Sequence, residues 1–132
     1  MLNTKQYQNT NDQNPKRLYD LEERTMLFAK EANAFVRALQ KDIITYENGK
    51  QLVRSAGSVA ANYIEANEAL SKKDFIMRIK ICRKEAKESR LWLNLILPST
   101  QTNQSRDHLL DEATQLMKIF GAILTKTGNA KF

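Results

Sequence analysis

Residues 71–97 form one long amphipathic stretch that constrains the fold more than any other feature of the chain. Its apolar and small residues recur at intervals of three and four, which is typical of one face of an α-helix. This face contains Phe75, Ile79, Cys82, Ala86, Ser89 and Leu93. Ser71 is a predicted N-cap with Asp74 as its capping-box partner, and Pro98 ends the helix. A helix of about 25 residues is roughly 37 Å long.

Three further segments show the same helical periodicity. The first helix is expected to begin near residues 15–18, and its apolar stripe continues to Ile43. A loop centred on residues 42–49 separates it from the second helix, which has a small and polar outer face. The fourth helix follows a loop at residues 98–105 and ends near residues 127–128.

Four such helices with short connections predict an all-α fold, an antiparallel up-down-up-down four-helix bundle. The chain has only 4 glycines and 2 prolines, which leaves little material for the turns of a β-sheet protein. The bundle is expected over residues 17–126. The polar residues 1–16 are expected to form a disordered tail, and residues 127–132 a C-terminal tail.

The long third helix also holds most of the excess charge of the protein. Residues 71–97 contain eight Lys or Arg and three Asp or Glu, a net +5, while the whole chain carries +6. Basic side chains along one face of a helix are typical of surfaces that bind the phosphate backbone of nucleic acids. The alternative is a solvated helix face on which Glu85 and Glu88 pair with neighbouring bases. The candidate nucleic-acid-binding residues are Lys73, Lys80, Arg83, Lys84, Lys87 and Arg90.

Two sets of residues point to contacts between subunits. Apolar side chains on the outer wall of a bundle favour a contact with another subunit, although a bundle that buries more than one stripe would also explain them. The polar stripe on the second helix is an equally good match for a plain solvated face. The candidate oligomer-interface residues are Ile76, Met77, Leu91, Leu95, Arg54, Ser58, Asn62 and Glu65.

No residue pattern in the sequence indicates catalysis. His108 is the only histidine, so we expect a surface residue and no metal site. Cys82 lies on the apolar face, which predicts a buried thiol. We therefore expect no enzyme activity and no cofactor. The chain also lacks an apolar run long enough to span a membrane or an N-terminal secretory signal, so a cytoplasmic location is expected.

Two segments of the sequence resemble one known family. They are residues 52–67 with the following 71–75, and residues 84–93. Both are similar to the bacterial four-helix-bundle proteins encoded in intervening sequences of 23S ribosomal RNA genes, to which the accessory variability determinant of diversity-generating retroelements is related. The most specific match is the pattern Arg54, Ser55, Ser58, Asn62 and Glu65.

This resemblance implies a homopentamer, a barrel of bundles with a basic surface. The retroelement relative binds nucleic acid and a reverse transcriptase, and the family brings no catalytic residues. We therefore expect a non-enzymatic oligomer that binds RNA or DNA through its basic face, in association with ribosomal RNA. The alternative is a scaffold for a protein partner without a direct role in nucleic-acid binding.

Overall fold

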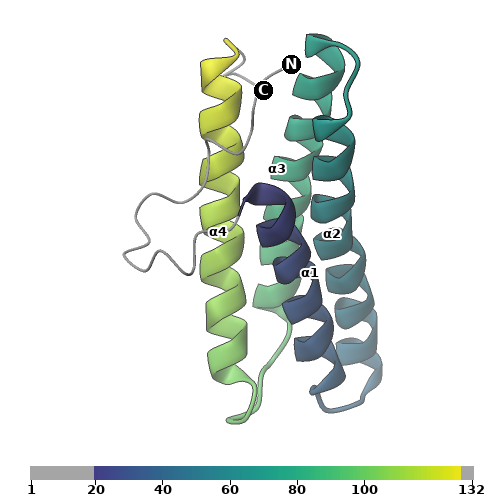
Figure 1. The fold of residues 1–132 in the computed structure, drawn as a ribbon. Helices are drawn as coiled ribbons and strands as arrows, with labels where there is room; N and C mark the ends of the chain where they lie inside the picture. The colour runs from purple at the N-terminus through teal and green to yellow at the C-terminus, as the bar shows by residue number, and fades with distance from the viewer. Residues whose placement is uncertain (1–19, 129–132) are drawn as a thin grey trace.

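The computed structural model describes residues 20–128, which form four helices that run alternately up and down (Figure 1). The helices are α1 (Leu21–Arg37), α2 (Ile43–Asn67), α3 (Lys72–Leu95) and α4 (Asn103–Lys126). The predicted all-α up-down bundle is thus confirmed. The predicted tail of residues 1–16 and residues 129–132 of the C-terminal tail lie outside the described residues.

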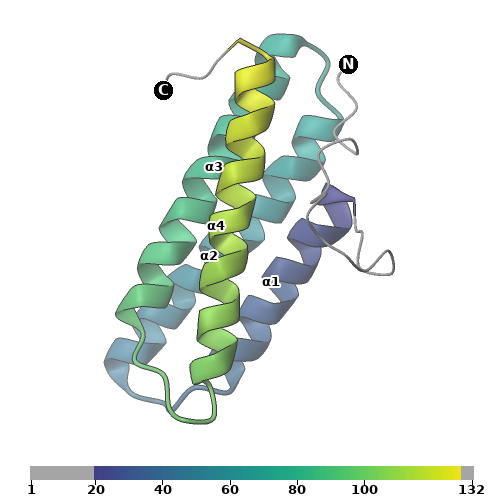
Figure 2. The ribbon, with the colours of Figure 1, turned by 90° about the vertical axis from the view of Figure 1, so that its left-hand side faces the viewer.

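Helices that follow one another in the chain also lie side by side. The two views show α1, α2, α3 and α4 in that order around the bundle, with α1 diagonal to α3 (Figures 1 and 2). The α1–α2 and α3–α4 loops lie at one end, and the α2–α3 loop lies at the other. The α1–α4 contact is the smallest of the four. Arg24 and Glu112 join these two helices through two hydrogen bonds of 2.8 Å.

Short polar side chains fix where the helices begin. The carboxylate of Asp20 accepts a hydrogen bond from the Glu23 backbone, and Asp42 does the same for Thr45. These caps satisfy N–H groups that the first turn of a helix leaves without partners. The predicted cap at Ser71 is confirmed, because its hydroxyl accepts a hydrogen bond of 3.1 Å from the Asp74 backbone.

Two predicted boundaries are wrong. The first helix ends at Arg37, so its apolar stripe does not continue to Ile43, which is 72% exposed in the first turn of α2. The predicted loop at residues 42–49 is instead the start of α2, because Asp42 caps this helix directly. Gly49, the last residue of the predicted loop, lies inside α2 and is buried.

The apolar stripes of all four helices meet in one core. Tyr63 and Phe120 bring their ring centroids within 6.2 Å of each other across the bundle. The largest fully buried side chains are Tyr63, Phe28, Phe75, Phe120, Leu21, Leu52, Ile79, Leu93, Ile96, Leu109, Leu116 and Ile123. Burial of this much apolar surface holds the helices together and fixes which side of α3 remains outside.

We predict that Gly49 is required for the close approach of α1 to α2. A Cβ atom at this position would lie 3.0 Å from Cγ1 of Val36. Gly49→Leu should therefore lower the free energy of unfolding by about 1–3 kcal/mol in chemical denaturation. Gly57→Leu is the matched control, because a Cβ atom there meets nothing within 4 Å. An equal effect of both substitutions on stability would contradict this role.

Candidate nucleic-acid interface

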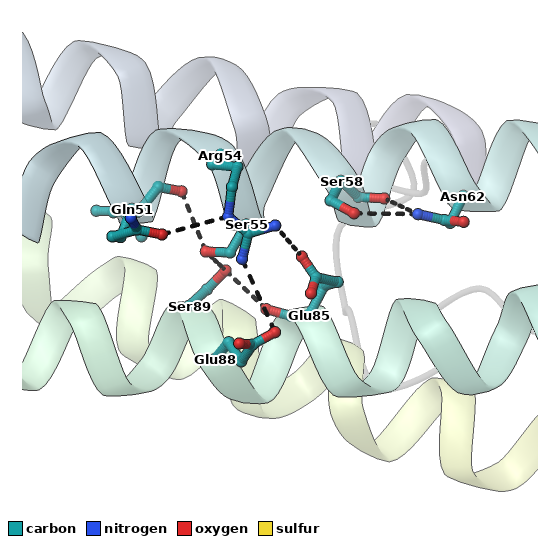
Figure 3. A network of polar contacts seen from close by, with 9 residues as sticks. Gln51, Arg54, Ser55, Ser58, Asn62, Glu85, Glu88 and Ser89 are labelled. Atoms are coloured by element: carbon teal, nitrogen blue, oxygen red, sulfur yellow. Dashed lines mark hydrogen bonds and ion pairs between the residues drawn. The ribbon is translucent and has the colours of Figure 1, made fainter.

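Helix α3 turns its acidic residues toward α2. Glu85 is buried between the two helices, and its Oε2 atom accepts a hydrogen bond of 3.0 Å from Nη1 of Arg54 (Figure 3). Glu88 lies one turn further along, with its carboxylate 3.9 Å from the same guanidinium. Asp74 pairs at 4.0 Å with Arg78 of its own helix. The acids of α3 thus have basic partners on the side that faces α2.

A row of further hydrogen bonds follows the same contact between α2 and α3. The buried hydroxyls of Ser55 and Ser89 are 2.8 Å apart (Figure 3). Asn62 donates to the Ser58 hydroxyl at 3.0 Å and accepts from Arg78 at 3.0 Å. We call this row the polar seam. Its members are Arg54, Ser55, Ser58, Asn62, Arg78, Glu85, Glu88 and Ser89.

Three of the four candidate interface residues on α2 belong to the polar seam. Arg54, Ser58 and Asn62 were expected to face another subunit, but the structure gives them partners within the chain. A helical wheel of α2 alone cannot distinguish a side that faces solvent from one that borders α3. Glu65 is exposed, as expected. An intersubunit contact at these four residues stays a prediction.

The carboxyl groups of Glu85 and Glu88 perturb each other. Burial raises the pKa of Glu85, but hydrogen bonds from Glu88, Arg54 and Ser58 and the Arg54 charge outweigh burial, so this pKa lies below its usual value. The pKa of Glu88 is raised, first by its hydrogen bond to Glu85 and then by burial. Glu85 is therefore the carboxylate that pairs with Arg54, and Glu88 protonates first on acidification.

This arrangement predicts a pH-dependent stability. Because the pKa of Glu85 is lower in the folded protein than its ordinary value of 4.5, its ionised carboxylate stabilises the folded state at pH values above 4.5. This stabilisation is lost as the pH falls through the pKa of the folded state. Glu85→Gln should therefore flatten the decrease in unfolding free energy between about pH 5 and pH 3. Thermal unfolding across this range provides the measurement, with Glu47→Gln, an exposed glutamate of α2, as the control. Parallel curves for Glu85→Gln and the unmodified protein would exclude this contribution.

The basic residues of α3 lie away from the polar seam. On a helix that turns about 100° per residue, the six candidates span about 120° around α3. The four lysines lie opposite the core-facing residues, and Arg83 and Arg90 lie between the lysines and the core, on the side of α4. Lys73, Lys84, Lys87 and Arg90 form no ion pair with any residue that the structure describes. We call the six residues the cationic surface. Its members are the exposed Lys73, Lys84 and Lys87 and the half-buried Lys80, Arg83 and Arg90.

Two arginines extend the cationic surface to the neighbouring helix α4. Nη1 of Arg90 lies 3.5 Å from the sulfur of Met117, a weak acceptor without charge. Nε of Arg83 lies 3.9 Å from the place where a side chain at Gly121 would begin. The surface therefore includes the outer wall of α3 and the edge of the α3–α4 contact.

The predicted apolar interface residues of α3 do not form one group. Ile76 is half-buried and packs against the core, whereas Met77 lies exposed among the lysines near the start of α3. Leu95 lies at the far end of α3, one turn after Leu91, and both are 49% exposed. Met77 thus shares its part of α3 with the cationic surface, whereas Leu91 and Leu95 lie beyond it.

Sequence reasoning missed an apolar patch at this end of the bundle. Ile43 and Ile44 in the first turn of α2 line a shallow groove together with Leu95 and Leu97. Leu97 is 88% exposed. The two adjacent isoleucines were the available signal, but Ile43 had been assigned to the first helix. We call this group the end patch. Its members are Ile43, Ile44, Leu95 and Leu97.

Cys82 and His108, the two other residues with potential chemistry, lie in the core and on the surface, respectively. Burial raises the pKa of the Cys82 thiol to about 12, so this thiol stays protonated in the core, as predicted. His108 is exposed and lies 3.4 Å from Glu31 of α1. Within residues 20–128, no three His, Cys, Asp or Glu side chains are placed to hold a metal ion. None of the described helices is long and apolar enough to cross a membrane.

These features define an all-α up-down bundle with a polar seam on one side of α3 and a cationic surface on the other. Residues 19–122 match the model of the family described as 23S rRNA-intervening sequence protein, and the chain belongs to this family. The family resemblance seen in the sequence is confirmed at this level. Comparison with curated proteins finds no match.

A solved structure shows the same fold. It is the crystal structure of a protein of unknown function from the S23 ribosomal protein family of Bacteroides thetaiotaomicron, with 29% sequence identity and a TM-score of 0.67. The match covers 78% of this chain and 96% of the other. The likeness therefore extends over nearly the whole of the other protein and most of this one.

Proposed function

We propose that this protein is a non-catalytic oligomer that binds nucleic acid through the cationic surface of α3. One observation carries the proposal: the acids of α3 face α2, where Arg54 and Arg78 pair with them. Lys73, Lys84 and Lys87 on the outer wall are exposed and form no ion pair with a residue that the structure describes. The alternative reading, a solvated helix face with interspersed ion pairs, would give these three lysines acidic partners at ion-pair distance. The charge of Lys84 lowers the pKa of Glu88, but no ion pair joins these two residues.

The binding energy would come from the release of counterions. Each Lys or Arg that neutralises a phosphate releases condensed cations from the nucleic acid, so affinity falls steeply as salt rises. Contacts of this kind position a protein on the backbone without reading the base sequence. RNA is the first ligand to test, because the family takes its name from an intervening sequence of ribosomal RNA.

The oligomer would bring several cationic surfaces together. The family resemblance implies a homopentamer, and weak contacts on several linked subunits strengthen one another through a high effective concentration. The end patch gives such an assembly an apolar contact that lies beyond the cationic surface along α3. Subunit contact and nucleic-acid binding would then use different parts of this helix.

The end patch makes a specific prediction about assembly. Replacement of both Leu95 and Leu97 by Glu should reduce the solution mass, measured by light scattering, to that of the single 15.2 kDa chain. Leu70→Glu is the matched control, since Leu70 is fully exposed in the α2–α3 loop at the opposite end. A monomeric unmodified protein, or an unchanged mass for the double variant, would contradict this role.

The function itself is tested by two experiments. Direct titration of labelled RNA at low salt should show binding by the unmodified protein, and a lack of binding would contradict the proposal. Affinity purification from a lysate treated with nuclease tests the alternative, a protein scaffold. Loss of all co-purified protein after nuclease treatment supports nucleic-acid binding. A partner protein that persists, together with no RNA binding in the titration, favours the scaffold.

A further inference from the structure

We propose that the ligand of the cationic surface is double-stranded nucleic acid and not a single strand. This inference rests on the proposed function and specifies the form of its ligand. Three features of the surface support it, namely its straightness, its lack of an aromatic side chain and its division into two rows of cations.

The cationic surface is straight and rigid. All six residues belong to α3, and the axial distance from Lys73 to Arg90 is about 25 Å at 1.5 Å per residue. A double helix is also stiff over this length, with a persistence length of about 150 base pairs. Two rigid partners lose little conformational freedom on contact. A flexible single strand would have to be ordered along the same line, at a cost in entropy.

The surface offers no platform on which bases could stack. Proteins that bind single strands combine positive charge with aromatic side chains, and each stacked base contributes about 1–3 kcal/mol. Among the described residues, only one aromatic side chain is exposed, Tyr46 in the first turns of α2. Trp92 of α3 is half-buried, packs against the core and lies two turns after Glu85, on the side that faces α2. The cationic surface itself contributes charge alone.

The cations form two rows on α3. The lysines occupy the outer wall, and Arg83 and Arg90 lie against α4, about 80–100° around the helix from Lys73 and about 40–60° from Lys87. One strand can follow one row. A double helix presents two phosphate backbones, so both rows can contact phosphates together.

The experiment compares an RNA duplex of about 20 base pairs with an unstructured RNA strand that carries the same number of phosphates. At about 100 mM salt, we expect the duplex to bind at least about tenfold more tightly in fluorescence anisotropy. Equal or tighter binding of the single strand would overturn the inference while leaving the proposed function in place. If neither RNA binds at low salt, the proposed function and the inference both fail.

A substitution on α4 tests the second row separately. Gly121→Glu would place a carboxylate beside Arg83, and Gly121→Gln adds a similar volume without the charge. We expect Gly121→Glu to weaken duplex binding about three- to tenfold, with little change in single-strand binding and little effect of Gly121→Gln. An equal loss for both RNAs, or for both variants, would contradict the two-row arrangement.

Discussion

Combined replacement of Lys80, Lys84 and Lys87 by Glu is expected to lower the affinity for duplex RNA more than about 100-fold at 100 mM salt. The change removes three cations from the cationic surface and adds three anions to it. Each of these residues is at least partly exposed, so the bundle should keep its helical content and its melting temperature within a few degrees. Fluorescence anisotropy and circular dichroism provide the two measurements.

The control for this variant has the same change in net charge at another place. Lys30, Lys41 and Lys50 are exposed and belong to α1, the α1–α2 loop and α2. Their combined replacement by Glu should lower RNA affinity less than about tenfold, because it changes only the long-range electrostatic field of the protein. Equal losses in the two triple variants would show that net charge, and not the cationic surface, governs binding.

Arg24→Ala is expected to lower the free energy of unfolding by about 3 kcal/mol, the largest effect among the stability predictions. Arg24 is buried and bonds Glu112 through two nitrogen–oxygen contacts of 2.8 Å, and this pair joins helices that otherwise meet over few residues. Its loss leaves the Glu112 carboxylate, only 18% exposed, without its partner. Chemical denaturation at one fixed protein concentration measures the effect.

A second variant separates the buried charge from the loss of packing. Combined replacement of Arg24 by Met and Glu112 by Leu removes both charges and keeps most of the volume. Because apolar pairs often replace buried ion pairs without loss, this double variant should lie within about 1 kcal/mol of the unmodified protein. A loss below about 1 kcal/mol for Arg24→Ala would show that the pair does not hold α1 in place.

The sequence was sufficient to predict four helices and their order, because their apolar spacing is long and regular. The positions of Phe75, Cys82 and Phe120 in the core follow directly from that spacing, and all three are buried. Helix boundaries were less predictable. The predicted loop ended at Gly49, but this glycine lies inside α2, where the absence of a side chain leaves room for Val36 of α1. A glycine has the same appearance in a sequence whether it ends a helix or allows a close contact between two helices.

The candidate site was predictable only in part. The position of the lysines opposite the core of α3 depends on one helix and could be deduced from its periodicity. The pairing of Glu85 with Arg54 depends on how α2 and α3 pack together, so it could not be predicted from the sequence pattern of α3 alone. The end patch combines the first turn of α2 with the end of α3 for the same reason. Features shared by distant segments appear only once the packing is known.

The salt dependence of RNA binding tests the central claim most directly. If most of the six cations contact phosphates, the slope of log K against log salt concentration for duplex RNA should be about −4 to −5. The Lys80, Lys84 and Lys87 triple variant should have a slope shallower by about three units. A slope near zero for the unmodified protein, or the same slope for both proteins, would contradict binding through the cationic surface.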